Sequence, residues 1–570
     1  MTGTISERIW NAKYRWREGD AIRDLSIEDT WHRIARTLAS REKDGDRESE
    51  FYSVLENFAF LPGGRILAGA GTHHRVTLFN CFVMGTIEDS LAGIFDSLKQ
   101  GAITMQQGGG VGYDFSTLRP CGMPAKGVGM IASGPVSFMK IWDSMCGTIL
   151  STGARRGAMM ATLRCDHPDI LDFIEAKQNG GSLRHFNLSV LATDDFVQAV
   201  RADREWPLVF GGKVFRRVQA AALWERIMRA AYSCAEPGII FIDRVRRADN
   251  LAYCETISAT NPCGEIPLPP YGACDLGSIN LTRFIASPFT GLASVDFAGI
   301  ARTAGIAVRM LDNVYDLSRF PLPEQRRVAR SSRRLGLGIT GLADALVMLG
   351  IHYGSMAARK TAHDIMKAIK EAAYLASIEL AREKGAFPLF KPAYLKSEFV
   401  GSLPEEIRQD IARHGIRNSH LTAIAPTGTI SLLADNISSG LEPIYALEFE
   451  RSIRQADGRL DTVRVADYAF RLFREKMGEN APLSPAFATA DAVSPEEQLL
   501  MQAALQQHVD NAISKTVNVS ECFDFDSFAS LYDRAFELGL KGCTAFRPNP
   551  VTGQVLVEKP HCCSSEREPD

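Results

Sequence analysis

The sequence contains no long apolar run and no large excess of charge of either sign. No stretch approaches the ~18 apolar residues that a membrane-spanning helix requires. The first residues of the chain lack the apolar core of a signal peptide. A net charge of -3 over 570 residues gives no electrostatic reason to bind nucleic acid or a membrane surface. We therefore expect a cytoplasmic protein with neither a nucleic-acid nor a membrane partner.

The twelve cysteines lack the CxxC spacing that zinc sites favour. In a cytoplasmic protein they are expected to be reduced, so a cluster of them indicates catalysis more than a disulfide framework. The adjacent His73 and His74 are predicted to lie in a surface loop and not in a metal site. Buried structural thiols are expected at Cys121, Cys146, Cys165, Cys234, Cys254 and Cys522.

Helical and β-like patterns alternate along most of the chain. Ser26 and Asp29 form a helix-start signature before "WHRIARTLAS", and a long helix is expected to end at Gly385. "GIIFID" and "LTAIAP" are typical of buried strands. The pattern predicts an α/β protein with a mostly parallel sheet or barrel. The arginines between 326 and 334 are predicted to form a charged helix face.

The most unusual stretch, "TNPCGEIPLPPYGACDLGSINL", places an amide, a thiol and a carboxylate at alternating positions: Asn261, Cys263 and Glu265. In an extended segment these side chains would point to the same side. A nearby carboxylate raises the pKa of a thiol, so the site is poorly suited to a thiolate nucleophile and better suited to hydrogen-atom chemistry. The alternative is a turn-rich loop around a buried cysteine.

A set of motifs in fixed order accompanies this stretch. They are "LFNCFVMGTIEDSL", "GGGVGYDFSTLRP", "SGPVSFMKIWD", "GARRGAMMATLRCDHPDILDFI", "NPCGE", "ACDLGSINL", "RRLGLGITGLAD", "APTGTISLLADNISSGLEP" and "GLKGCTAFRPN". Together they resemble class II, adenosylcobalamin-dependent ribonucleotide reductases. The resemblance implies a ten-stranded α/β barrel over residues 60–548. The helical pattern at the start predicts an N-terminal helical region over 1–59, and the polar, aperiodic end predicts a mobile C-terminal tail over 549–570.

The resemblance also implies a role for each reactive side chain. Cys263 would become the thiyl radical that abstracts the ribose 3′ hydrogen, and Glu265 would accept the 3′-hydroxyl proton. Asn261 would hold the substrate hydroxyls. Cys81 and Cys274 would supply two reducing equivalents and end as a disulfide. Cobalt would be carried by the cofactor, so no protein metal site is expected.

The segment "APTGTIS" has the chemistry of an anion cradle, with hydroxyls and backbone N–H groups after an apolar run. It lacks the GK[ST] of a Walker A loop. A strand-to-helix turn with a threonine cap is the alternative. The resemblance implies that the substrate is bound by Asn80, Thr427, Gly428, Thr429 and Ser431.

Regulation and re-reduction are also implied by the resemblance. A deoxynucleotide effector would contact Asp89 and Arg119, and the loop carrying Arg155 and Arg156 would relay its message, across a homodimer interface. The chain ends with adjacent cysteines, Cys562 and Cys563, where relatives commonly have CxxC. These two thiols are expected to pass electrons from thioredoxin or a similar reductant to the active site.

The radical source separates two enzyme interpretations. Large subunits of class I enzymes need two adjacent tyrosines near the C-terminus, whereas this chain has Ala545 and Phe546. Neither side chain can replace tyrosine in the relay, which favours adenosylcobalamin. We expect reduction of ribonucleotides, with diphosphates favoured as substrates. A class I-type large subunit and a catalytically inactive nucleotide-binding paralogue remain the alternatives.

Overall fold

The computed structural model describes residues 4–43, 46–124, 131–151, 155–156, 158–178, 182–454 and 460–548. Its centre is a ten-stranded sheet in the order β18-β15-β4-β5-β8-β9-β12-β22-β21, with β3 paired to β15. The strands are β3 (Phe60–Pro62), β4 (Cys81–Val83), β5 (Gly110–Asp114), β8 (Met159–Arg164), β9 (Phe186–Ala192), β12 (Gly238–Phe241), β15 (Ala273–Asn280), β18 (Leu335–Thr340), β21 (Thr516–Asn518) and β22 (Gly542–Phe546). The expected ten-stranded α/β architecture is confirmed.

Two groups of parallel strands meet in antiparallel pairs. Strands β4, β5, β8, β9 and β12 run parallel to one another, and so do β15 with β18 and β21 with β22. The groups join through the antiparallel pairs β15–β4 and β12–β22. Isolated bridges at Thr422 and Ile424 link β18 to Ile513, just before β21, and close the barrel. The predicted "LTAIAP" strand is thus present only as isolated bridges.

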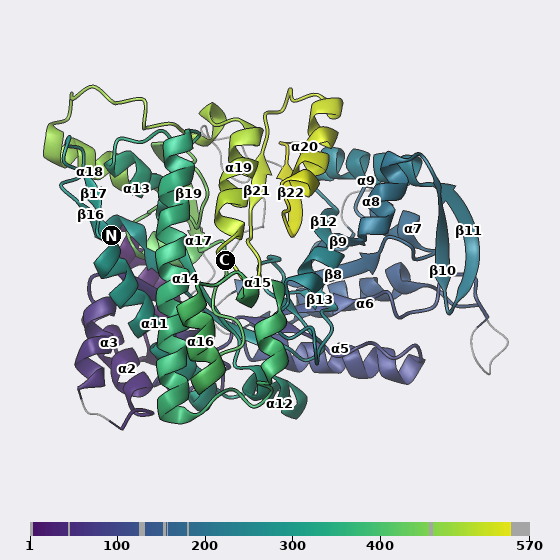
Figure 1. The fold of residues 1–570 in the computed structure, drawn as a ribbon, viewed down its shortest axis with the longest axis horizontal. Coiled ribbons are helices and arrows are strands. Elements are labelled where there is room, and N and C mark those ends of the chain that lie inside the picture. Colours follow the sequence, from purple (N-terminus) through teal and green to yellow (C-terminus); the bar gives the residue numbers. More distant parts are fainter. Residues whose placement is uncertain are drawn as a thin grey trace.

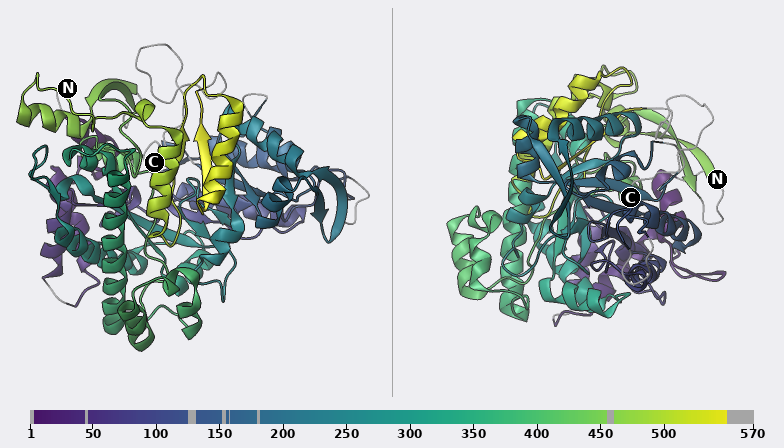
Figure 2. Two further views of the ribbon diagram at one scale, coloured as in Figure 1. Left: turned by 45° about the horizontal axis from the view of Figure 1, so that its top comes forward. Right: turned by 90° about the vertical axis from the view of Figure 1, so that its right-hand side faces the viewer.

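Helices cover the outside of the barrel (Figures 1 and 2). The predicted caps are confirmed: Ser26 and Asp29 form a capping box at α2 (Ile27–Ala39), and α14 (Met356–Lys384) ends at Gly385. The other main helices are α3 (Arg47–Leu55), α5 (Leu91–Gln106), α6 (Pro135–Thr148), α9 (Ala220–Cys234), α11 (Phe297–Leu317), α12 (Pro323–Ser332), α16 (Glu405–His414), α19 (Pro495–Gln506) and α20 (Phe525–Glu537). In Figure 1, α2 and α3 lie at the opposite end from the hairpin of β10 (Glu205–Phe210) and β11 (Lys213–Gln219).

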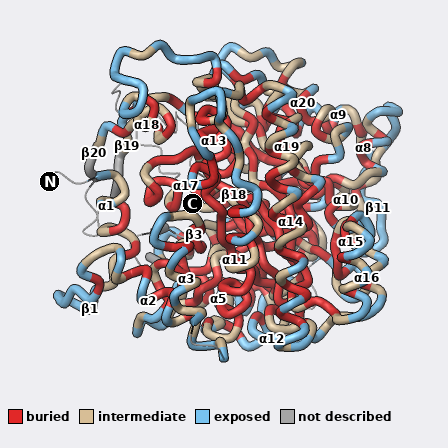
Figure 3. Tube along the Cα trace, turned by 60° about the vertical axis from the view of Figure 1, so that its left-hand side comes forward, coloured by how far each residue is buried: buried red, intermediate tan, exposed pale blue. Residues whose placement is uncertain are grey.

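Most buried apolar side chains form one large cluster, and a smaller separate cluster contains Cys81 and Cys274; buried residues of every kind are red in Figure 3. All eight residues of β15 are buried, because neighbouring strands and α11 pack around it. A strand buried on both faces has no reason to alternate apolar and polar residues. Within the described ranges, no helix is both long and apolar enough to cross a bilayer.

The predicted arginine face is wrong for two residues. Arg326 and Arg327 are exposed on α12, as expected, but Arg333 and Arg334 are buried. The helix ends at Ser332, and Arg333 takes a left-handed conformation with φ of 48°. The chain then enters the barrel wall at β18 and carries both guanidinium groups inside.

Candidate active site

The "NPCGE" stretch is the turn of a β-hairpin inside the barrel. Strands β13 (Ala259–Thr260) and β14 (Pro267–Leu268) pair antiparallel on either side of it. The backbone N–H of Asn261 donates to the carbonyl of Ile266 over 3.1 Å, and the Asn261 side chain accepts from the Ile266 N–H over 2.9 Å. Gly264, with φ of 85°, allows the chain to reverse. The extended conformation expected for residues 261–265 is therefore wrong.

The turn brings the amide and the carboxylate to Cys81. Asn261 donates a hydrogen bond from Nδ2 to the Cys81 sulfur over 3.2 Å, and that thiol faces Glu265 Oε1 at 3.9 Å. Cys81 on β4 stands directly opposite Cys274 on β15 in the antiparallel register. Residues 193 positions apart (274 minus 81) are thus cross-strand neighbours, a separation that suits disulfide formation without backbone movement.

Burial sets the protonation of the site. It raises the pKa of Glu265 to about 7, above its ordinary 4.5. Burial, followed by the nearby Glu265 carboxylate, raises the pKa of Cys81 well above its usual range. Glu265 Oε2 is buried and has no hydrogen-bond partner among the described residues. A carboxylate with one free oxygen and a pKa near neutrality is suited to accept a proton from a bound hydroxyl.

Cys263 differs from the other two thiols in its exposure. It lies at the tip of the turn and is half-buried, whereas Cys81 and Cys274 are fully enclosed. Its neighbour Pro262 is fixed by a hydrogen bond of 2.8 Å from Asn187 Nδ2 to the proline carbonyl. The Glu265 carbonyl accepts from the Ala512 N–H over 2.8 Å. Asn187, in β9, and Ala512, in a loop before β21, support the turn from distant parts of the chain, and no local sequence pattern identifies them.

The glycine-rich β5 makes room for the hairpin. A Cβ at Gly112 would lie 1.8 Å from the Thr260 carbonyl oxygen, and one at Gly110 would lie 3.1 Å from the Pro262 side chain. Both glycines belong to the motif "GGGVGYDFSTLRP", and they allow a backbone to approach closely.

We predict that Gly112→Ala displaces the hairpin. The added methyl group meets backbone and not a flexible side chain, so the chain must shift, which costs roughly 1–3 kcal/mol. Thermal unfolding should show a lower Tm, and Glu265 should lose its contact with Cys81. Gly291→Ala is the matched control, since nothing lies within 4 Å of its added Cβ. An unchanged Tm for Gly112→Ala would contradict the tight packing.

The predicted phosphate cradle is a turn followed by the short helix α17 (Gly428–Leu433). Thr427 is buried, and its hydroxyl accepts from the Gly440 N–H over 2.8 Å and pairs with Thr340 over 3.0 Å. Ser431 is buried as well and donates to the Gly428 carbonyl over 3.1 Å. Thr429 is only half-buried. Thr427 and Ser431 therefore shape the turn, and Thr429 is the more accessible hydroxyl.

Asn80, the remaining predicted substrate contact, precedes β4. It is half-buried, and its Oδ1 has no hydrogen-bond partner among the described residues. Its backbone carbonyl accepts a hydrogen bond from the Gly110 N–H over 2.8 Å. Asn80 therefore lies beside β5, the strand that packs against the hairpin.

The predicted effector residues are placed only in part. Asp89 and Arg119 bind each other, with Arg119 Nε 2.9 Å from Asp89 Oδ2. Arg119 also donates to the Pro124 carbonyl over 3.0 Å, so this pair holds two loops together. Arg155 and Arg156 form β7, but their side chains lie outside the described residues. Cys562 and Cys563 also lie outside the described residues.

The other sequence predictions divide as follows. Cys146, Cys165 and Cys234 are buried as expected, whereas Cys121, Cys254 and Cys522 are exposed, which corrects that prediction. The exposed three lie in turns or loops and not on a core-facing strand or helix. His73 and His74 are exposed, as predicted. No group of three or more metal-ligating side chains occurs in the part of the chain that the structure describes.

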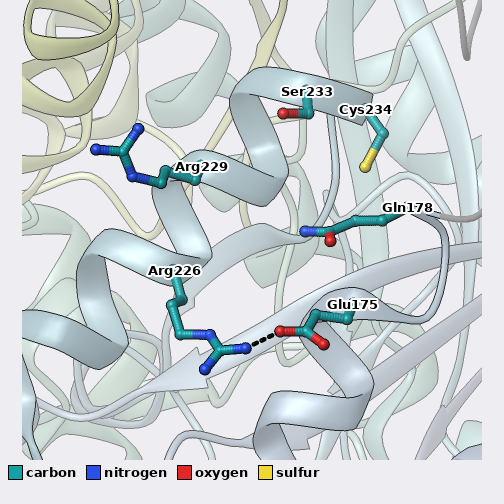
Figure 4. Close-up of a pocket in the computed structure, with 6 residues that line it drawn as sticks. All are labelled: Glu175, Gln178, Arg226, Arg229, Ser233 and Cys234. Atoms are coloured by element: carbon teal, nitrogen blue, oxygen red, sulfur yellow. Dashed lines mark hydrogen bonds and ion pairs between the residues drawn. The ribbon is translucent and has the colours of Figure 1, made fainter.

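A separate cavity of about 470 Å³ lies beside α7 (Ile170–Glu175) and α9. Figure 4 shows its lining, including the ion pair between Arg226 and Glu175. The lining contains none of the predicted site residues and is formed by Glu175, Gln178, Arg226, Arg229, Ser233 and Cys234. The reactive groups of the hairpin therefore define the candidate active site.

Comparison with known proteins agrees with this geometry. The family description "Ribonucleotide reductase, barrel domain" matches residues 79–546, and "Ribonucleotide reductase, all-alpha domain" matches residues 1–75. A vitamin B12-dependent ribonucleoside-diphosphate reductase of Mycobacterium tuberculosis is 41% identical over 92% of this chain and 76% of its own length. One of Thermoplasma acidophilum is 37% identical over 89% of this chain and 66% of its own length.

A more distant relative carries a different name. The ribonucleoside-diphosphate reductase subunit alpha of Chlamydia pneumoniae is 26% identical over 97% of this chain and 59% of its own length. The match of the barrel model over most of the chain, together with the convergence of the hairpin on Cys81 and Cys274, leads to one conclusion. The chain belongs to the ribonucleotide reductase family.

Proposed function

We propose that this chain reduces ribonucleoside diphosphates to 2′-deoxyribonucleoside diphosphates, with adenosylcobalamin as the radical source. The observation that carries the proposal is the convergence of Asn261 and Glu265 on Cys81, directly opposite Cys274. The relatives named as vitamin B12-dependent ribonucleoside-diphosphate reductases support both the substrate class and the cofactor.

The side chains divide the chemistry between them. Cys263, as a thiyl radical, takes the ribose 3′ hydrogen, while Glu265 accepts the 3′-hydroxyl proton and Asn261 holds the hydroxyls. The 2′-hydroxyl leaves as water after gaining a proton. Cys81 and Cys274 provide two electrons and two protons and become a disulfide, and Cys263 returns the hydrogen to C3′. The sum is one ribonucleotide and one dithiol converted to one deoxyribonucleotide, one disulfide and water.

The residues present suit adenosylcobalamin. This group brings its own cobalt, so the described part of the chain needs no metal-ligand cluster. It must act on one thiol, and Cys263 is the site cysteine that is partly exposed. When bound, adenosylcobalamin supplies an organic radical by homolysis of its carbon–cobalt bond. Ala545 and Phe546, in β22, cannot serve as a tyrosine relay from a separate subunit.

A reduction assay tests the proposal against its alternatives. The chain is incubated with a ribonucleoside diphosphate, dithiothreitol and adenosylcobalamin, and deoxynucleotide is measured by chromatography. We expect product with adenosylcobalamin alone. Product only after addition of a metalloprotein subunit would support the class I-type alternative. Absence of product under every condition, despite nucleotide binding, would support the inactive paralogue.

The phosphate cradle yields a separate prediction. We propose that the substrate phosphates lie at the start of α17, with Thr429 and the backbone N–H groups as donors, and that Asn80 contacts the substrate. Replacing Thr429 by Val keeps its shape and removes one hydroxyl. A lost hydrogen bond to a charged group costs about 1.5–3 kcal/mol, so KM should rise roughly tenfold or more with little change in kcat. Steady-state kinetics measure this split; an unchanged KM would remove Thr429 from the site.

The remaining partners are also proposals. We expect a deoxynucleotide effector near Asp89, Arg119, Arg155 and Arg156, within a homodimer. We further expect a thioredoxin-like protein to reduce the active site through Cys562 and Cys563. The paired change Cys562→Ser and Cys563→Ser should leave the dithiothreitol-driven rate intact, because a small dithiol reaches the barrel by itself. The thioredoxin-driven rate should fall at least about tenfold; equal rates with thioredoxin would exclude the tail.

A further inference from the structure

Arg334 stands beside the proposed reducing pair. Cys81 is opposite Cys274 in the β4–β15 register, and Asp275 is opposite Leu335 in the parallel β15–β18 register. Continuing the second register back by one residue places Arg334 next to Cys274. Cys81, Cys274 and Arg334 therefore occupy one row across β4, β15 and the residue that immediately precedes β18, and residues of one row share a face of the sheet.

The guanidinium group is held in place by backbone and carboxylate oxygens. Arg334 is 1% exposed. Nη1 donates to the Pro267 carbonyl, at the end of the active-site hairpin, over 2.6 Å. Nη2 donates to Glu255 and lies 3.6 Å from Asp249 Oδ1. Nε, the donor nearest the strand, has no acceptor among the described residues. One hydrogen-bond donor is thus left free on the side chain next to Cys274.

Several titratable groups surround this row. A cavity of about 10 Å³ lies beside Arg334, and its lining also includes Pro267 and Asp510. The volume is that of about one water molecule. The charged and titratable groups near Arg334 and Cys274 include Asp249, Glu255, Glu265, Asp275, Tyr315, His420, Asp510 and Lys541. Burial lowers the pKa of His420 and lowers that of Lys541 to about 8, so both carry less positive charge than usual.

The charges act on Cys274 in opposite directions. Burial, and after it the adjacent Asp275, raises the pKa of the Cys274 thiol well above its usual range. Glu265 and Asp510 act in the same sense, whereas Arg334 lowers this pKa. For Cys81, Glu265 and the other two thiols oppose a thiolate, the hydrogen bond from Asn261 favours one, and no positive charge is among the main influences. Arg334 therefore favours negative charge on one sulfur of the pair.

We propose that Arg334 is a positioning residue that makes Cys274 the leaving group when the active-site disulfide is reduced. This inference rests on the proposed function, in which Cys81 and Cys274 form that disulfide. Its evidence is the shared row, the free Nε donor and the attachment of the same guanidinium group to the hairpin.

The step is an ordinary thiol–disulfide exchange. The thiolate of an external dithiol attacks the Cys81 sulfur and forms a mixed disulfide with it. The Cys81–Cys274 bond breaks, and its electron pair stays on Cys274 as a thiolate beside Arg334. The Cys274 thiolate then takes up a proton from solvent. The second thiol of the reductant attacks the mixed disulfide, releases Cys81 and leaves the reductant oxidised. A thiol of lower pKa leaves faster, so the nearby positive charge speeds the first exchange.

The test uses the full chain and does not depend on nucleotide reduction. The protein is oxidised with hydroxyethyl disulfide, the Cys81–Cys274 bond is confirmed by peptide mass mapping, and its reduction by dithiothreitol is followed between pH 6.5 and 9. Arg334→Met removes the charge at similar length and should slow reduction about tenfold or more. Arg334→Lys keeps the charge and should stay within about threefold of the wild type. A wild-type rate and pH profile for Arg334→Met would overturn the proposal.

Arg333→Met is the matched control. Arg333 is also buried and binds Asp312 over 2.8 Å, but it is not among the main charges acting on Cys274. Its loss should lower Tm and leave the reduction rate within about twofold. Equal slowing in both variants would mean general loosening and would also overturn the proposal.

A measurement on the unchanged protein covers the case in which Arg334→Met does not fold. The oxidised wild type is mixed briefly with the monothiol 2-mercaptoethanol, quenched with acid, and mapped by mass spectrometry. We expect the mixed disulfide on Cys81; predominant capture on Cys274 would refute the assignment. A wild type that shows this exchange but makes no deoxynucleotide would refute the proposed function and leave the role of Arg334 standing.

Discussion

Replacing Cys263 by Ser is expected to abolish nucleotide reduction. A hydroxyl has nearly the size of a thiol but holds its hydrogen too strongly to form the corresponding radical. Because no other described thiol stands at the tip of the hairpin, no side chain can substitute. We expect the rate to fall by at least about 10³-fold, as when a residue that reacts covalently is removed. Product formation with adenosylcobalamin and dithiothreitol is the measurement.

The control separates the loss of chemistry from a loss of structure. Cys522→Ser changes an exposed cysteine in the same way and should retain the wild-type rate. Calorimetric titration should show that the Cys263→Ser protein binds the ribonucleoside diphosphate as the wild type does. Turnover above about 1% of the wild type in the Cys263→Ser protein would contradict the radical role.

Replacing Glu265 by Gln is expected to lower kcat by about 10²–10⁴-fold, the usual contribution of a general base. The wild-type rate should also fall as pH drops through about 7, because burial raises the pKa of Glu265 to about 7 and only the carboxylate accepts a proton. Glutamine keeps an oxygen near Cys81 but cannot accept the proton. Rates measured between pH 5.5 and 8.5 for both proteins test this; a parallel pH profile in Glu265→Gln would exclude the role.

The same carboxyl has a matching effect on stability. Its pKa is higher in the folded protein than the ordinary 4.5, so its neutral form favours folding. This contribution is complete below about pH 4.5 and is lost as pH rises through about 7. Glu265→Gln is neutral throughout and should unfold at a higher temperature than the wild type at pH 8. The full difference in free energy of unfolding is about 3 kcal/mol at most.

Much of the fold follows from local patterns in the sequence. Ser26 with Asp29 and Gly385 mark helix ends that any tertiary arrangement must respect, and both are present. The strand predicted at "LTAIAP" does not form a regular ladder, because its residues pair with the sheet only through isolated bridges. Arg334 was misassigned because the helical pattern continues past Ser332, and only the left-handed turn at Arg333 directs the chain inward.

The candidate site follows from local sequence only in part. Asn261 and Glu265 were expected to lie together because side chains alternate along an extended strand. They do lie together, but because a hairpin turn brings both to Cys81. The proximity of Cys81 and Cys274 depends on strand order, which no short motif encodes; family resemblance supplied it. Asn187 and Ala512 hold the hairpin through single hydrogen bonds whose partners are distant in the sequence.

The antiparallel pairing of β4 with β15 has a consequence for the lifetime of the enzyme. Each group of parallel strands contributes one sulfur, so oxidation would cross-link positions 193 apart (274 minus 81) in the unfolded chain. Closing a loop of that length removes roughly 5 kcal/mol of chain entropy from the unfolded state. An enzyme that has turned over once and lacks reductant would therefore resist unfolding better than a reduced one. The oxidised enzyme would therefore stay folded while reductant is absent, and it could turn over again once a dithiol reduces its disulfide.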